Sequence, residues 1–414
     1  MKKKLLFVAA ATALSASSFA GGFQLNLQGL RQTAMGGSGV AMPWDASSMF
    51  YNPGAFARLH SLGVSGNAFL TMPHVKFLQQ PTGGYSYNND TKLGTPIAAY
   101  IGGNLGKSDN ALSKLAVGVG VYTPFGNSLH WDPDWTGRYM VQSISLSSIF
   151  FQPTVSYEIA DVISIGAGFV YGIGNVEIDK AVPIQDKNGK DGHANLAGKA
   201  SGIGFNAGVH IKASNNVSVG LSYRSGVRMK VKEGTAKFDV TSSVASNFPT
   251  TNFSSELPLP GILTGGVAVK ATPKLTLQGD LVYAFWSSYD SLKFDFVDNT
   301  PAVVDAAEPR EYRNTIAVRI GGNYEVNDWL DVMVGGAFDP TPSQTHLVSP
   351  DAVDANRISV SAGLSFKPVS GLTITAGASY TTTPVRETFY DPAGFQGSYK
   401  INSLTPALGI SFEF

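Results

Sequence analysis

The sequence contains no cysteine, which excludes disulfide bonds and thiolate metal sites. Charged residues make up only 14% of the chain, whereas soluble globular domains carry roughly 25%. Lysine and arginine together number 30, and so do aspartate and glutamate. The basic surplus of nucleic-acid-binding proteins is therefore missing, and no nucleic-acid partner is expected. The chain also lacks a run of about 18 apolar residues, the length that a transmembrane helix requires.

Patterns for catalysis are absent from the sequence as well. The six histidines are scattered, and no two of them have the spacing of metal ligands. Gly106-Lys107-Ser108 resembles the end of a phosphate-binding loop, but Ile101 stands where that loop requires a glycine. No Gly-x-Ser-x-Gly turn opens a helix. The sequence therefore predicts that the protein is not an enzyme and has neither a cofactor nor a metal site.

The beginning of the chain has the parts of a secretory signal peptide. Lysines at positions 2–4 precede a short apolar core over 5–13, and small residues follow up to Ala20. We therefore predict that residues 1–20 are removed by cleavage near Ala20, so that Gly21 begins the mature protein.

Residues 59–414 repeat one unit, in which about ten residues alternate between apolar and small or polar side chains before a break. Segments 217–223 and 358–366 show the pattern clearly, with branched or aromatic residues on one face and mainly Ser and Gly on the other. Seven long breaks alternate with six short ones. This pattern predicts an all-β fold, a 14-stranded antiparallel transmembrane β-barrel of the bacterial outer membrane.

The breaks also orient the barrel. The long breaks lie near 74–91, 124–137, 181–197, 233–253, 295–309, 340–355 and 385–398. An even number of strands leaves both ends of the barrel on the periplasmic side and the long loops outside. The alternation ends at Phe414, and a terminal aromatic residue resembles the signal that the barrel assembly machinery recognises.

The front segment, residues 21–58, does not alternate and is too apolar for a disordered tail. Turn-forming pieces such as Asn52-Pro53-Gly54 divide it into short elements. Two interpretations remain, a cap on the periplasmic side or a hatch that plugs the lumen. A 14-stranded barrel encloses a wide water-filled hole unless something fills it, which favours the hatch.

Several short segments, taken in order, resemble one known family. They are Gly22-Phe23-Gln24-Leu25, Asn52-Pro53-Gly54, Tyr122-Thr123-Pro124-Phe125-Gly126, Gly204-Phe205-Asn206-Ala207-Gly208, Leu221-Ser222-Tyr223-Arg224-Ser225, Leu257-Pro258 and Ala337-Phe338-Asp339-Pro340-Thr341-Pro342. The family comprises outer-membrane transporters of long-chain fatty acids and of aromatic hydrocarbons such as toluene and xylene (FadL/TodX). Each segment is short, but their order and spacing cover nearly the whole mature chain.

The resemblance implies a barrel closed by an N-terminal hatch, to which Gly21 and Phe23 belong, with a hydrophobic small molecule bound inside. Cargo passes without ATP and leaves sideways through a gap in the wall beside a kinked third strand. By position the third strand spans 114–122, and Gly118 and Gly120 are candidates for the kink. A second interpretation is that these small lumen-facing residues make room for the hatch.

If the alternation continues, a group of charged side chains faces the lumen, and those over 224–232 either face inward or rise into the fourth loop. The basic residues are Arg224, Arg228, Lys230, Lys232, Arg313 and Arg319. Such residues either brace the hatch by pairing with an inward acid such as Asp280, or create a field that favours anionic cargo. Fatty-acid members of the family carry a base on the fifth strand, where this chain has Asn175. The expected entrance loop over 182–198 is also shorter and more polar than that of the family.

Three functions remain open from the sequence. Passive uptake of fatty acids or neutral hydrocarbons is favoured, and the missing base on the fifth strand leans toward neutral cargo. The alternatives are a general diffusion porin and an adhesin or structural barrel with binding loops. The expected partners are a hydrophobic ligand and outer-membrane lipid and lipopolysaccharide, and the barrel is expected to be a monomer.

Overall fold

The computed structural model describes residues 22–414 except 60, 80–85, 89–91, 107–110 and 186–187. The predicted signal peptide over 1–20, Gly21, and Lys107 and Ser108 of the loop-like motif lie outside the described residues. No helix within the described ranges combines the length and apolarity needed to cross a bilayer.

Short helices form the front of the chain, and strands form almost all the rest. The α-helices are α1 (Leu30–Ala34), α2 (Ser48–Tyr51) and α3 (Pro53–Phe56), and the 3-10 turns are η1 (Ala111–Lys114), η2 (Ala245–Asn247), η3 (Trp286–Ser288), η4 (Thr345–Leu347) and η5 (Asp391–Ala393). The strands are β1 (Leu62–Phe69), β2 (Met72–Gln79), β3 (Ser86–Asn88), β4 (Ile97–Asn104), β5 (Leu115–Tyr122), β6 (Gly126–His130), β7 (Ser143–Ala160), β8 (Ile163–Gln185), β9 (Asp191–Lys212), β10 (Val217–Arg224), β11 (Val227–Asp239), β12 (Thr251–Leu259), β13 (Ile262–Thr272), β14 (Leu275–Ala284), β15 (Ser291–Phe296), β16 (Ala306–Pro309), β17 (Thr315–Asn327), β18 (Leu330–Asp339), β19 (Arg357–Val369), β20 (Leu372–Thr382), β21 (Arg386–Tyr390) and β22 (Phe395–Glu413).

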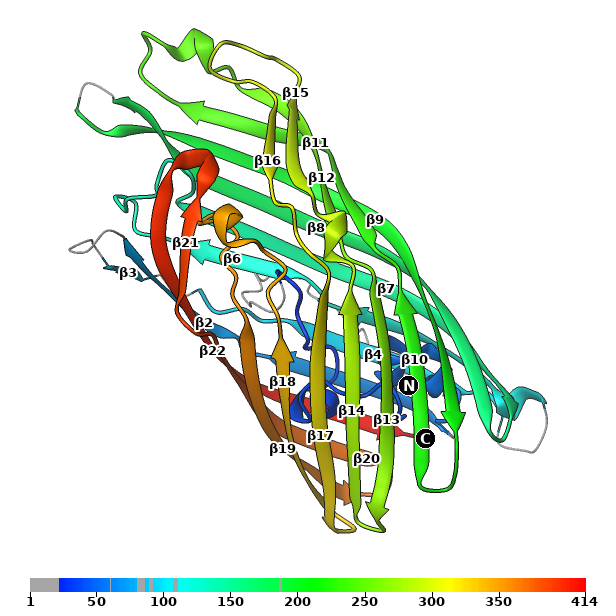
Figure 1. The fold of residues 1–414 in the computed structure, drawn as a ribbon. Helices are drawn as coiled ribbons and strands as arrows, with labels where there is room; N and C mark the ends of the chain where they lie inside the picture. The colour runs from blue at the N-terminus through cyan, green and yellow to red at the C-terminus, as the bar shows by residue number, and fades with distance from the viewer. Residues whose placement is uncertain (1–21, 60, 80–85, 89–91, 107–110, 186–187) are drawn as a thin grey trace, which may run out of the picture.

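The strands pair in a closed antiparallel ring, which confirms the predicted 14-stranded barrel (Figure 1). The order around the ring is β1, β4, β5, β7, β8, β9, β10, β13, β14, β17, β18, β19, β20 and β22. The last strand pairs back with the first, with Gly63 opposite Glu413, and the N–H of Phe414 donates to the carbonyl oxygen of Leu62 at 2.9 Å. Closure leaves no strand edge to be exposed to lipid.

The outer face of the ring is apolar. Ile203, Leu221 and Leu408 are 64%, 52% and 66% exposed, which in a water-soluble sheet would be an aggregation hazard but suits a surface that lipid covers. The inner face carries buried polar residues instead, such as Ser222 and Thr405. The period-two pattern of the sequence thus separates the lipid face from the lumen.

Several strands continue beyond the apolar belt at one end of the barrel, where β8, β9, β11, β12 and β15 form a tall wall (Figure 1). The prediction of a loop over 182–198 was wrong, because β8 continues to Gln185 and β9 begins at Asp191. The hairpin is extended because Ala194 and Leu196 pack with Phe253 of β12 in a buried cluster.

The front segment from Gly22 to Leu59 lies among the barrel strands, drawn in blue in Figure 1. Its hydrogen bonds reach strands all around the ring: Leu30 to Asn67 of β1, Met49 to Gln152 of β7, Asn52 to Val209 of β9, Gly39 to Asp280 of β14 and Arg31 to Asp331 of β18. Because these partners line the inner face, the segment occupies the lumen.

Candidate functional site

An apolar cavity of about 80 Å³ lies inside the barrel, and we call it the inner pocket. Its lining is Phe23, Phe125, Asn127, Ile144, Leu146, Ser147, Ser148, Gly174, Val176, Ile178, Leu196, Ala200, Met229, Val231, Phe253, Ser255, Leu257, Leu259, Tyr289, Leu292, Phe294, Asp351 and Ala352. Mostly aliphatic and aromatic side chains surround it, as in pockets that hold hydrophobic small molecules.

The inner pocket depends on two adjacent barrel strands. Partway along each of them, the alternation of side chains between the lumen face and the outer face shifts by one residue. Tyr223 in β10 is on the outer face, but Val227 in β11 is buried toward the lumen, so residues 225–226 shift the alternation by one. Residues 260–261 produce the same shift between β12 and β13, directly beside the first. Because the two breaks lie side by side, the two strands remain in register. Beyond the breaks, Leu259 and its apolar neighbours face the lumen.

This exchange corrects the prediction for Arg228. The side chain of Arg228 is 74% exposed on the outer face, where it pairs with Glu256 at 3.0 Å. Lys230 also approaches Glu256, and Lys232 follows on the same face. The prediction was wrong because alternation was continued from β10 into β11 across a break that reverses it.

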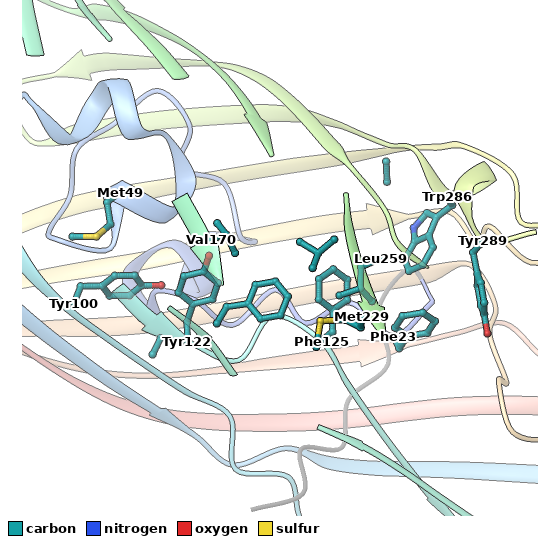
Figure 2. Packing of buried hydrophobic residues seen from close by; sticks show 14 of the residues in the cluster. Phe23, Met49, Tyr100, Tyr122, Phe125, Val170, Met229, Leu259, Trp286 and Tyr289 are labelled. Carbon is teal, nitrogen blue, oxygen red and sulfur yellow. The ribbon is translucent and has the colours of Figure 1, made fainter. Parts of the chain in front are cut away.

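Phe23 forms the wall of the inner pocket nearest the chain start. Phe23 is 8% exposed. Its ring centroid lies 5.3 Å from that of Trp286 and 5.7 Å from that of Tyr289, and both pairs are edge-to-face. Figure 2 shows these rings in one row that continues through Phe125 and Tyr122 toward the front helices. The row joins the inner pocket to the segment that fills the lumen.

The residue before Phe23 is anchored by a buried ion pair. The N–H of Gly22 faces Asp354 Oδ2 at 3.4 Å, and Arg357 donates to the Gly22 carbonyl oxygen at 3.3 Å. Arg357 also pairs with Asp354, and both side chains are almost fully buried. Gly22 has φ +71°, and a Cβ there would lie 2.7 Å from the Trp286 ring, so glycine is required at this turn.

A second buried ion pair lies next to the lining of the inner pocket. Arg310 donates to Asp351 at 2.7 Å and to Glu308 at 2.8 Å, and its side chain is 1% exposed. Burial alone would raise the pKa of Asp351, but the Arg310 guanidinium lowers the pKa of this carboxyl below its ordinary value. Burial raises the pKa of Tyr289 to about 12, so this phenol is neutral at physiological pH.

The third barrel strand bends inward between β5 and β6. Tyr122 pairs with Phe150 of β7, and Gly126 pairs with Ser147, so three residues, 123–125, face only two on β7. This is a bulge of one extra residue, and Pro124 within it has no N–H to donate to a ladder. The wall hydrogen bonds between β5 and β7 stop at this bulge.

The front segment takes the place of β7 in the backbone hydrogen bonds of the bulge, and β7 reaches it through the Ser148 hydroxyl, which donates to the Phe125 carbonyl oxygen. Leu25 N–H donates to the Pro124 carbonyl oxygen at 2.8 Å, and Gly126 N–H donates to the Phe23 carbonyl oxygen at 3.1 Å. The Gln28 side-chain amide donates to the carbonyl oxygen of residue 123 at 3.1 Å. The kink of the third strand and the start of the chain therefore form one hydrogen-bonded unit.

A second hollow lies at this bulge, and we call it the wall hollow. Its lining is Thr95, Ile97, Thr123, Ser147, Ser148, Ile149, Ile173, Gly174, Asn175, Lys199, Ala200 and Ser201. Ile97 and Ile173 belong to the exposed outer face, whereas Ser148 and Gly174 also line the inner pocket. The wall hollow thus lies between the inner pocket and the outer surface of the barrel.

A third hollow, the mouth pocket, lies at the loop end. Its lining is Tyr139, Met140, Ile178, Lys180, Leu196, Phe238, Leu292, Phe294, Phe296, Ala302, Val303, Val304, Ala306, Glu308, Ser349, Asp351 and Tyr390. It shares Ile178, Leu196, Leu292, Phe294 and Asp351 with the inner pocket. Three hollows therefore adjoin in series from the loops to the side wall.

Of the predicted hatch residues, Asn52, Pro53 and Gly54 lie at the contact with β7 to β9. Asn52 caps α3 by accepting from Gly54 N–H at 2.9 Å, and its amide donates to Val40 and Val209 carbonyl oxygens at 2.8 and 3.0 Å. The Pro53 carbonyl oxygen accepts from a β7 serine hydroxyl at 2.6 Å. A Cβ at Gly54 would lie 2.7 Å from backbone oxygen of β9, so the helix approaches the wall closely.

Gly118 and Gly120 lie within continuous pairing of β5 with both neighbours, and the bulge begins three residues beyond Gly120. A Cβ at Gly118 would approach Met49 at 2.6 Å and Phe56 at 2.9 Å. A Cβ at Gly120 would lie 2.7 Å from the Tyr100 ring. The side of β5 that carries these glycines is therefore filled by the front segment and by Tyr100.

Two of the predicted arginines reach the front segment. Arg224 donates to the Phe50 carbonyl oxygen at 2.7 Å and to the Tyr122 hydroxyl at 2.8 Å. Arg319 donates to Asn26 at 2.9 Å and lies 3.6 Å from Asp339.

The acid expected to pair with Arg319 has another role. Asp280 accepts from the N–H groups of Gly39 and Val40 at 2.7 and 3.1 Å. Asp280 also lies directly opposite Arg319 in the pairing of β14 with β17, so it stands beside the predicted base while it anchors the front segment.

Two other candidates do not reach the lumen. Arg313 is exposed before β17 and donates to Gln344 at 2.5 Å. Asn175 is exposed on the outer face of β8 beside the wall hollow, between inward-facing Gly174 and Val176. The prediction that Asn175 is a candidate ligand contact in the lumen was wrong, because the resemblance to the fifth strand of the family did not establish which face of the strand this position occupies.

Sequence reasoning missed loop 340–356, which supplies Asp351 and Asp354, and it missed Trp286 and Tyr289. The loop was counted only as a break in the strand pattern. The loop combines Asp, Ser and Pro with the apolar residues Val348 and Val353, which indicates a folded loop. In the structure both valines are buried. Within the described ranges, no three His, Cys, Asp or Glu side chains form a group that could hold a metal ion.

Comparisons with known proteins agree with this architecture. A family model described as outer membrane protein transport protein (OMPP1/FadL/TodX) matches residues 11–414. An outer membrane protein of Neisseria meningitidis serogroup B is 28% identical over 444 residues, covering 96% of this chain and 93% of the relative. The long-chain fatty acid transport protein of Escherichia coli K12 is 22% identical over 426 residues, covering 92% and 93%. The crystal structure of a Pseudomonas aeruginosa FadL homologue matches with a TM-score of 0.81 at 18% identity, covering 95% of this chain and 100% of that one.

Proposed function

Because the chain belongs to the outer membrane protein transport family (OMPP1/FadL/TodX), we propose that its inner pocket carries hydrophobic small molecules passively into the cell. The family consists of outer-membrane transporters and not enzymes. The observation that carries the proposal is the inner pocket itself, an apolar cavity within a barrel whose lumen the front segment fills. A water-filled porin has no use for such a cavity.

The front segment acts as the hatch in this proposal. It contacts strands around the whole ring, and two buried acids on one side of the wall, Asp280 of β14 and Asp331 of β18, anchor it there. Water and salts are then excluded, while a hydrophobic molecule gains free energy by leaving water for the inner pocket, about 25 cal/mol per Å² of apolar surface. Transport follows the concentration gradient and needs no coupled energy source.

We place the exit at the bulge of the third strand. The wall hollow adjoins both the inner pocket and the apolar outer face, and no β5–β7 ladder bonds cross residues 123–125. A hydrophobic molecule that leaves sideways enters lipid and avoids the polar end of the lumen. Gly118 and Gly120 contribute by making room for the hatch beneath this gate.

The entrance is the mouth pocket, whose lining continues into the inner pocket through Leu196 and Phe294. The route runs from the mouth pocket to the inner pocket and then to the wall hollow. The outer belt contacts membrane lipid and lipopolysaccharide, Phe414 serves recognition by the assembly machinery, and the barrel functions as a monomer after cleavage near Ala20.

A cavity-filling substitution tests the proposed route. Ala200 of β9 lines both the inner pocket and the wall hollow, whereas Ala197 of the same strand lies on the outer face. Ala200→Phe is expected to reduce cellular uptake of a radiolabelled hydrocarbon at least about tenfold, because it fills the path between the two hollows. Ala197→Phe, the matched control, is expected to transport normally. Equal uptake by both variants would reject the route.

A further inference from the structure

The outer face of β22 shows where the apolar belt ends on the side of the long loops. Its outward side chains include the exposed Phe412, Leu408 and Leu404, and the next two toward the loop end are Asn402 and Lys400. The eight residue steps from Phe412 to Leu404 extend about 27 Å along the strand, which a tilt of about 40° reduces to about 21 Å across the membrane. Because the apolar band of such barrels is about 25 Å tall, Lys400 lies at the level of the outer-leaflet headgroups.

Two lysines lie directly opposite each other at this level. Lys76 of β2 pairs with Lys400 of β22 in the antiparallel register. Both side chains are exposed, whereas their chain neighbours Val75 and Tyr399 are buried, so both lysines belong to the outer face of the wall. The Cβ atoms of directly opposite residues are about 5 Å apart, and like charges at that separation destabilise a sheet unless a counter-charge is present.

Among the described residues, no carboxylate forms an ion pair with either of these lysines. Glu387 of β21 lies opposite the residue two positions from Lys400 and makes no ion pair with it. Other bases on the outer face have a partner of opposite charge, since Arg228 and Lys230 both pair with Glu256. The two opposed lysines therefore carry positive charge that the described part of the wall does not neutralise.

A neutral donor adjoins the lysine pair on the membrane side. Asn402 lies opposite His74, two residues from Lys400 along β22. Asn402 Oδ1 accepts from the Thr382 hydroxyl at 2.7 Å and from the Tyr380 hydroxyl at 3.4 Å. These bonds fix the oxygen of the amide, so its nitrogen is the atom that can donate to a ligand. Two ammonium groups and an amide nitrogen on one face are the donors that phosphate oxygens accept from.

We propose that Lys76, Lys400 and Asn402 bind a phosphate group of lipopolysaccharide in the outer leaflet, with the acyl chains of that lipid against Leu404 and Leu408. The phosphate supplies the missing counter-charge, and a lipid presents its phosphate directly above its acyl chains, in the same order as the lysine pair and the apolar belt on this wall. Free phosphate would use the same donors but gain nothing from the apolar side chains. The site is separate from the cargo route, because none of its three polar residues lines the inner pocket, the wall hollow or the mouth pocket.

The test measures binding of lipid A, the phosphorylated anchor of lipopolysaccharide, to the full-length protein in detergent by native mass spectrometry. We expect bisphosphorylated lipid A to bind at least about tenfold more tightly than lipid A whose phosphates have been removed. Lys76→Gln/Lys400→Gln is expected to lose this difference. Lys212→Gln/Lys270→Gln, the matched control at the short-turn end, is expected to keep it. Equal lipid A affinity in the unmodified protein and the Lys76/Lys400 variant would overturn the proposal, and so would displacement of lipid A by inorganic phosphate, which would make free phosphate the ligand.

The proposal is independent of what the barrel transports, and a second ligand shows this. Both double variants are expected to bind a neutral fluorescent probe, N-phenyl-1-naphthylamine, in the inner pocket as tightly as the unmodified protein, because the substituted lysines lie outside its lining. Loss of probe binding in the Lys76/Lys400 variant alone would contradict a site separate from the cargo route.

Thermal unfolding tests the charge argument with a single substitution. Lys400→Glu converts the opposed lysines into an ion pair, so without lipid A the variant is expected to unfold at a temperature equal to or higher than the unmodified protein. Lipid A is expected to raise the unfolding temperature of the unmodified protein and of Lys76→Arg/Lys400→Arg, which keeps both charges, but not that of Lys400→Glu. The same lipid-induced shift in Lys400→Glu, or a lower unfolding temperature of this variant without lipid, would contradict the proposal.

Discussion

The N–H group of Leu25 donates a hydrogen bond to the carbonyl oxygen of Pro124 across 2.8 Å. This bond joins the start of the chain to the bulge of the third barrel strand, where pairing with β7 is interrupted. The proposed hatch and the proposed side gate are therefore neighbours in hydrogen bonding as well as in space. A shift of the front segment would alter the wall at the same point.

Phe23→Ala is expected to weaken probe binding in the inner pocket by about tenfold. The ring contributes edge-to-face contacts with Trp286 and Tyr289, each pair worth about 0.5–1.5 kcal/mol, and it forms one wall of the cavity. Fluorescence titration with the neutral probe measures the change. Phe205→Ala serves as the control, because Phe205 is 52% exposed on the lipid face. Identical affinities for the two variants would show that Phe23 is not part of the binding site.

Asn52→Ala is expected to loosen the hatch. The substitution removes the cap of α3, worth about 1 kcal/mol, and two further bonds to Val40 and Val209. In planar bilayers we expect brief conducting events that the unmodified protein lacks, with deletion of residues 21–55 as the fully open reference. Asn215→Ala, in an exposed turn, is the control. A silent Asn52 variant would indicate that the hatch is held mainly by its other contacts.

Asp331→Ala is expected to destabilise the protein strongly. Asp331 is buried and pairs with Arg31 of the front segment and Lys367 of β19, each at 2.9 Å. Removing the acid leaves Arg31 without its counter-charge, which typically costs about 3–5 kcal/mol. Thermal unfolding, followed by the heat-dependent shift in gel migration, measures the loss. Asp328→Ala in an exposed turn is the control, and equal midpoints for both would contradict the role assigned to this pair.

The barrel was predictable from the sequence because most strands obey the same local rule along their whole length. Outward residues such as Leu221 must be apolar and inward ones such as Ser222 small or polar, so the period of two is visible without knowledge of neighbours. The burial of the front segment was predictable for the opposite reason, since its apolar residues break that rule and still have to be buried.

The inner pocket was not predictable in the same way, because it arises from breaks in two different strands. Residues 225–226 and 260–261 each reverse the alternation, and only their side-by-side position keeps the sheet paired. This is why Arg228 was assigned to the lumen, when its neighbour Met229 is the residue that lines the pocket. Asp351 and Asp354 belong to loop 340–356. The loop sequence has no periodic pattern from which the direction of a side chain could be predicted.

The account rests on the claim that cargo leaves sideways at the bulge, and deletion of Pro124 tests it most directly. Removing the one extra residue allows β5 and β6 to pair with β7 continuously and keeps Phe125 facing inward. Pro124→Ala retains the extra residue and is the matched control. The account predicts that the deletion variant still binds the neutral probe but loses uptake of a radiolabelled hydrocarbon, while Pro124→Ala keeps both. Undiminished uptake by the deletion variant, with the same probe affinity, would contradict exit through the wall.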